Sequence, residues 1–177
     1  MMGTRWGRRD QLHEAGIRTQ RALSQLARVR SAYEPIRLRL PAETPSSLLD
    51  DGDDLSNFHD SAYFAVIAIR QAVAVRDALH SSGLDLPPIK HHDAITHLRD
   101  LGEHWPDNIR GRPVRAERKW FSKSAVDRPG FVYGLDSADN LASLSGLPLS
   151  ELEHDLTEVL KALSAARQEF ETEPEST

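Results

Sequence analysis

The segment 58-FHDSAYFAVIAIRQAVAVRDALHS-81 is the strongest helix prediction in the chain. Between Ala62 and Ile69 it is apolar on nearly every side, so a helix here has to be surrounded by other elements or by a second subunit. Gly83 and the prolines that follow it end this helix and begin a turn. The segment therefore predicts either the central helix of a helical fold or a helix at a dimer interface.

A first flanking helix is expected at residues 8–34, upstream of this segment. Apolar and small side chains recur there at heptad spacing, which places them on one stripe of a helix. Pro35 should close the helix, because proline lacks the backbone N–H that a helix interior needs. The stripe consists of Leu12, Ala15, Thr19, Ala22, Leu26, Val29, Tyr33 and Ile36.

Two more helices are expected downstream, at residues 89–105 and 148–171. The first has a buried face, and Pro106 should stop it near its last residues. In the second, Ser150 and Glu153 have the spacing of a capping box. The buried face of the 89–105 helix consists of Ile95, Leu98, Leu101 and Trp105.

The stretch between these two helices, residues 106–147, shows no helical periodicity. We expect an irregular basic insertion, with short strands or a hairpin in 118–124 and 129–135. The fold class predicted from these elements is all-α, a four-helix bundle with a long irregular basic insertion between helices 3 and 4. We expect residues 1–177 to form a single helical domain.

Composition narrows the function classes. The chain has 177 residues and no cysteine, which excludes disulfides, thiol catalysis and cysteine-based zinc sites. No apolar run approaches the ~18 residues that span a bilayer, and no signal-like segment follows the first residues. We therefore expect a cytoplasmic protein without a membrane partner.

The net charge of -5 conceals two basic segments, at residues 1–40 and 107–128. Either segment is suited to a phosphate backbone. The simpler interpretation pairs them with the acidic segments of the same chain or of a second subunit.

Histidines gather around the third predicted helix, which raises a metal site as an alternative. His97, Asp100 and His104 stand at i, i+3 and i+7 and share one helical face. The E-x-x-H and H-E-x-x-H signatures are absent, so these residues also fit half-exposed polar positions. Our principal hypothesis for the function of this chain involves no metal and no cofactor.

The segment Arg99-Asp100-Leu101-Gly102-Glu103-His104 ends the third predicted helix. An arginine, a polar residue directly after it and a histidine five positions on resemble the R-x(4–6)-H motif of HEPN domains. The pattern is loose and matches again at Arg8 to His13, but only the Arg99 match ends an amphipathic helix that follows a strongly hydrophobic one.

The resemblance implies a small helical bundle that acts as a homodimer, with the motif at the dimer interface. Many HEPN proteins are metal-independent ribonucleases, and many are toxins of toxin–antitoxin or phage-defence systems. The resemblance therefore implies RNA as substrate and an antitoxin protein as a partner. A non-catalytic helical module that binds a partner protein or nucleic acid is the alternative.

The residue types fit this chemistry. When the 2′-OH of RNA attacks the adjacent phosphate, a base with a pKa near neutral is needed, and His104 supplies one. Arg99 supplies a fixed positive charge for the phosphorane, and Asp100 would orient one of the pair. The basic insertion is then the natural element to hold RNA. Its candidate RNA-binding residues are Arg110, Arg112, Arg115, Arg118, Lys119 and Trp120.

Helix geometry sets a condition on this pair. Five residues place Arg99 and His104 about 140° apart around a continuous helix. They converge on one phosphate only if the helix breaks near Gly102 and Pro106 or if a second subunit completes the site. Otherwise Arg99 is a surface residue bonded to Glu103 at i+4.

Overall fold

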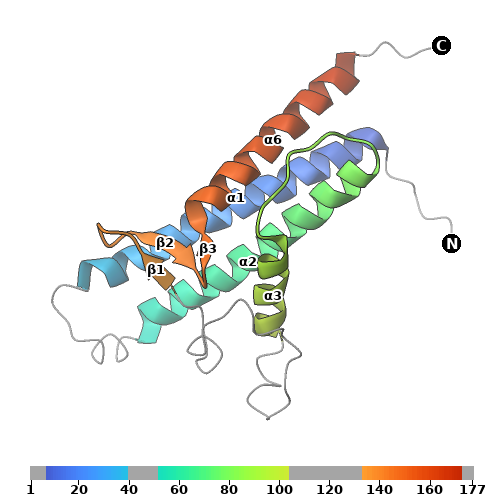
Figure 1. The fold of residues 1–177 in the computed structure, drawn as a ribbon. Helices are drawn as coiled ribbons and strands as arrows, with labels where there is room; N and C mark the ends of the chain where they lie inside the picture. The colour runs from blue at the N-terminus through green and yellow to red at the C-terminus, as the bar shows by residue number, and fades with distance from the viewer. Residues whose placement is uncertain (1–6, 40–51, 104–132, 173–177) are drawn as a thin grey trace.

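The computed structural model describes residues 7–39, 52–103 and 133–172, and within these ranges the chain forms four helices and a small sheet. The helices and strands, in chain order, are α1 (Arg8–Arg39), α2 (Gly52–Ser81), α3 (His92–Glu103), β1 (Tyr133–Leu135), β2 (Leu141–Leu144), β3 (Leu147–Pro148) and α6 (Leu149–Thr172). Figure 1 shows α1, α2 and α6 running side by side, with α3 across α2 and the sheet at one end. The described chain is therefore mainly helical, as predicted.

Helix α1 buries the stripe that the heptad spacing predicted, and all eight of its residues are buried. The one polar member, Thr19, is satisfied because its hydroxyl donates to the Ala15 carbonyl at 2.9 Å. The expected stop at Pro35 is wrong, since α1 continues to Arg39. Buried Ile36 and an ion pair between Arg39 and Asp54 hold this last turn against the core and α2.

Helix α2 begins at Gly52, six residues before the expected start at residue 58. Asp53 and Asp54 occupy its first turn, where carboxylates interact favourably with the positive end of the helix dipole. The apolar centre of α2 packs on α1 and α3, but it is not enclosed on every side, because Phe64 is 56% exposed. The expectation of an enclosed helix therefore holds for one face and not for the other.

Helix α3 begins at His92, three residues later than expected. The two prolines before it favour an extended backbone, and His91 takes a left-handed conformation with φ of 60°. The Ile95 N–H then donates to the His91 carbonyl at 2.9 Å and starts the helix. Of the predicted buried face, Ile95 and Leu98 are buried, while Leu101 and Trp105 lie outside the described side chains.

The sheet is the main departure from the predicted all-α fold. Strand β1 lies within the expected 129–135 segment. Strand β2 occupies residues predicted to be irregular, and β3 spans the predicted boundary between the insertion and the last helix. The strands pair antiparallel in the order β1-β2-β3. The Asp136 carboxylate accepts the N–H groups of Ala138 and Asn140 and closes the first turn, while Gly146, with φ of 82°, serves the second.

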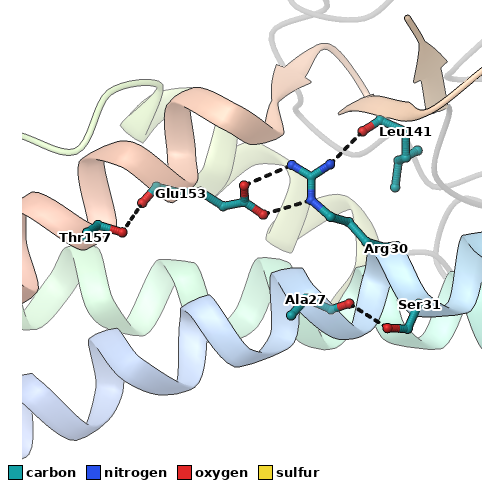
Figure 2. A network of polar contacts seen from close by, with 6 residues as sticks. All are labelled: Ala27, Arg30, Ser31, Leu141, Glu153 and Thr157. Carbon is teal, nitrogen blue, oxygen red and sulfur yellow. Dashed lines mark hydrogen bonds and ion pairs between the residues drawn. The ribbon is translucent and has the colours of Figure 1, made fainter. Parts of the chain in front are cut away.

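The start of α6 differs from the predicted capping box. The helix begins at Leu149, so Ser150 lies inside it, and the Glu153 carboxylate binds Arg30 instead. Both guanidinium contacts to Glu153 are 2.9 Å, and Arg30 also donates to the Leu141 carbonyl at 3.1 Å (Figure 2). One α1 side chain thus joins α6 to strand β2.

An aromatic cluster closes the same end of the fold. The rings of Tyr33, Phe58 and Tyr133 lie with centroids 5.5 to 5.9 Å apart, from α1, α2 and β1. The Tyr33 hydroxyl donates to the Asp139 carbonyl at 3.3 Å, and burial is the main reason that its pKa rises to about 12. Within the described helices, none is long and apolar enough to cross a membrane.

Candidate functional site

Of the predicted site residues, Arg99 has a described side chain. It lies half-buried on α3. His97 and Asp100 are placed on α3 by their backbone, but their side chains lie outside the described residues. His104, the expected stop at Pro106 and the RNA-binding candidates between residues 110 and 120 also lie outside them. The pairing of Arg99 with His104 therefore stays a prediction.

Arg99 opens onto a concavity of about 330 Å³ on the outer face of α2. We call this hollow the arginine concavity, because arginines from three helices line it. Helix α2 contributes one arginine and all of the other described lining residues, while α1 and α3 contribute one arginine each. The lining consists of Arg18, Ile67, Arg70, Gln71, Ala74 and Arg99.

Each arginine reaches the concavity through a different local arrangement. On α1, the Glu14 carboxylate accepts a 2.7 Å hydrogen bond from Arg18 one turn away and fixes the direction of that side chain. On α2, Arg70 follows buried Ile69 and is itself half-buried at the margin of the core. On α3, Arg99 follows buried Leu98 in the same way. The core packing of all three helices therefore determines the geometry of the site.

The position of Arg99 depends on the connection between α2 and α3. The Arg76 guanidinium, whose side chain is 12% exposed, donates to the carbonyls of Leu86 and Pro87, the latter at 2.8 Å. From the other side, buried Asp155 of α6 accepts the Lys90 N–H at 2.8 Å. These contacts hold the connection between α2 and α6 and so set where α3 begins.

The lining of the arginine concavity suits an anion. A guanidinium stays charged at all physiological pH values and offers five donors in a planar fork that matches phosphate. Glu14 offsets the charge of Arg18, and no residue of the described ranges bonds to or pairs with Arg70. Among the described residues, the lining has no side chain that exchanges protons near neutral pH. These residues can bind an anion, and proton transfer needs a further group.

No group of three or more histidine or acidic side chains forms a metal site within the part of the chain that the structure describes. The histidines that flank the start of α3 face carboxylates singly. His91 Nε2 lies 3.5 Å from Glu151 of α6, and His92 Nδ1 lies 3.5 Å from Asp77 of α2. The metal site predicted at His97, Asp100 and His104 lies outside the described residues, because the side chains of these three residues are not described.

Sequence reasoning identified Arg99 but missed Arg70 and gave Arg18 no role. Arg18 was one of nine arginines in the first 40 residues, and nothing in their spacing separates it from the others. Arg70 carries a clearer signal, since it directly follows the apolar run from Ala62 to Ile69. A charge placed beside such a run lies at the edge of a buried face, where functional side chains are often found.

Comparison with known proteins leaves the family open. No family model matches the chain, and no solved structure matches it. Over 96 residues the chain is 36% identical to the endoplasmic reticulum mannosyl-oligosaccharide 1,2-alpha-mannosidase of mouse. That match covers 47% of this chain and 14% of the mannosidase, so the chain spans a small part of that relative's length.

Proposed function

We propose that this protein is a HEPN-like, metal-independent endoribonuclease that acts in a toxin-type or defence role. The observation that supports the proposal is the placement of Arg99 beside two further arginines in one concavity. Phosphodiester cleavage without a metal needs fixed positive charge at the phosphate, and guanidinium groups provide it. On this proposal, α1, α2, α3 and α6 correspond to the four-helix bundle that the HEPN resemblance implies.

The reaction that we propose is attack by a neighbouring group of the RNA itself. His104 removes the proton of the 2′-OH, and the 2′-oxygen forms a bond to phosphorus while the bond from phosphorus to the 5′-oxygen breaks. His104, which has become an imidazolium by taking this proton, then protonates the leaving 5′-oxygen. The dipole near a helix C-terminus favours the imidazolium form. Arg99 stabilises the charge that develops on the phosphorane, and Asp100 orients the pair. The products are a cyclic phosphate end and a 5′-hydroxyl end.

A second subunit is part of the proposal, because Arg99 and His104 diverge on a continuous helix. The outer face of α2 is the surface that we assign to it. Phe64 is 56% exposed there and lies one turn before Ile67, which lines the arginine concavity. A homodimer through this face would place the concavities of the two subunits close to the shared surface. An antitoxin protein and the basic residues Arg110 to Trp120 complete the proposed set of partners and RNA contacts.

A non-catalytic helical module is the second candidate, and a specific observation favours it. The described lining of the arginine concavity contains no proton-transfer group. If His104 does not reach the concavity, the same arginines bind nucleic acid without cutting it.

The test is a cleavage assay on structured and single-stranded RNA with EDTA present. We expect the wild-type protein to cut, and Arg99→Ala and His104→Ala each to lower the rate by at least about a hundredfold. Arg28→Ala and His154→Ala are matched controls, because both residues are exposed and lie away from the concavity. Cleavage that EDTA abolishes would contradict the proposal and favour the metal alternative. Absence of cleavage would leave the binding module.

A further inference from the structure

The arginine concavity combines charge and shape in a way that the motif around Arg99 does not require. Three successive helices each contribute one arginine to the lining of the same hollow. Like charges repel, so positive charges gathered around one hollow favour a bound anion, even though Glu14 offsets the charge of Arg18. On a surface that binds no ligand, this repulsion favours arginines that lie farther apart.

We infer that Arg18 and Arg70 form a phosphate-binding subsite for the RNA backbone, next to Arg99. The identity of the ligand as RNA rests on the proposed function. The existence of an anion site rests on the three arginines alone. Neither Arg18 nor Arg70 belongs to the Arg99–His104 motif, so both are binding residues and not catalytic ones.

The shape of the hollow supports a ligand larger than a free ion. Its volume of about 330 Å³ lies at the lower end of small-molecule sites, enough for a phosphate together with part of the attached sugar. Ile67 and Ala74 give it an apolar wall, and the Gln71 amide adds a neutral donor and acceptor. A backbone phosphate carries a sugar on either side, and this mixture of surfaces suits it.

The Glu14–Arg18 pair allows the subsite to be tested by a gain of RNA affinity as well as by a loss. Glu14 holds Arg18 in place through the 2.7 Å bond, but its carboxylate also repels an incoming phosphate. Glutamine at this position keeps an oxygen that accepts from Arg18 and removes the negative charge. We therefore expect Glu14→Gln to bind RNA more tightly than the wild type.

The experiment measures binding of a labelled single-stranded 2′-O-methyl RNA, which lacks the attacking hydroxyl, as a function of salt. Each phosphate contact to a single strand contributes about 0.7 to the slope of log K against log salt concentration. Arg70→Gln should weaken binding about three- to tenfold and reduce that slope by about 0.7, and Arg18→Gln/Arg70→Gln by about 1.4. Arg28→Gln, an exposed arginine of the same helix as Arg18, is the matched control.

Thermal midpoints confirm that each variant is folded, and cleavage of unmodified RNA is followed in parallel. A reduced slope in Arg70→Gln without any wild-type cleavage would support the subsite and refute the nuclease. Cleavage that needs Arg99 and His104, with Arg70→Gln and Arg18→Gln both indistinguishable from Arg28→Gln, would refute the subsite and leave the nuclease standing. A wild-type protein that binds no RNA even at low salt would overturn the inference.

Discussion

Replacement of Arg76 by alanine should destabilise the fold more than replacement of any arginine on the open surface. Its side chain is 12% exposed, and its guanidinium donates to the carbonyls of Leu86 and Pro87. A hydrogen bond from a charged donor contributes about 1.5–3 kcal/mol net, and water can reach part of the space that alanine leaves. Because two carbonyls lose their donor together, we expect a loss of about 2–4 kcal/mol in the free energy of unfolding.

The measurement is urea unfolding followed by far-ultraviolet circular dichroism, with Arg76→Lys and Arg28→Ala beside Arg76→Ala. Lysine keeps the charge but not the fork, so we expect it to lose about half as much as alanine. Arg28 is exposed, and its replacement should stay within about 0.5 kcal/mol of the wild type. A loss below about 0.5 kcal/mol in Arg76→Ala would refute the reasoning.

The same experiment also tests whether Arg76 and Asp155 act on one segment. Asp155 accepts the Lys90 N–H from the opposite side of the α2–α3 connection. Because both residues hold the same stretch of backbone, their losses should not add, and Arg76→Ala/Asp155→Ala should lose less than the sum of the two single variants. Additive losses would show that the two residues stabilise the connection independently.

Three further changes test other parts of the fold. Arg30→Gln should lose about 1 kcal/mol in urea unfolding, because the Arg30–Glu153 pair is bidentate but partly exposed; no loss would contradict this. Burial lowers the pKa of His59, so the stability of the wild type should fall as pH drops below about 6.5. The thermal midpoint of His59→Gln should change less over that range, and parallel midpoint profiles of the two proteins would contradict a role of His59. Gly134→Ala places a Cβ against Ser143 Oγ and should lose about 1 kcal/mol, but not in a Ser143→Ala background; an equal loss in both would rule out the overlap.

Much of the helical architecture could be predicted from the sequence, because helices that bury one face repeat their apolar residues with a helical period. The α1 stripe from Leu12 to Ile36 is buried as predicted. The helix ends were harder to place. Pro35 stays within α1 because tertiary contacts around Ile36 and Arg39 outweigh the lost backbone bond, and propensity alone does not include such contacts.

The sheet and the arginine concavity could not be derived in the same way. Strands of two to four residues are too short for their alternation to be recognised, and β2 and β3 depend on pairing with each other. The meeting of Arg18, Arg70 and Arg99 depends on how three helices pack, and a linear pattern does not encode that distance. Of these three arginines, the R-x(4–6)-H motif includes only Arg99, because no histidine follows Arg18 or Arg70 at that spacing.

The packing of α1 against α6 has a consequence for how the chain is made. The ribosome delivers the end of α2 about 90 residues before the end of α6, from Ser81 to Thr172, and α1 and α2 can form a local helical hairpin as soon as they emerge. Throughout that interval, the side of α1 that α6 will cover has no partner within the described fold. Val29 and Leu26 on α1 and Leu152 and Leu156 on α6 all end fully buried. The nascent protein therefore exposes apolar surface of α1 until α6 has emerged, and chaperones have their opportunity to bind during that time.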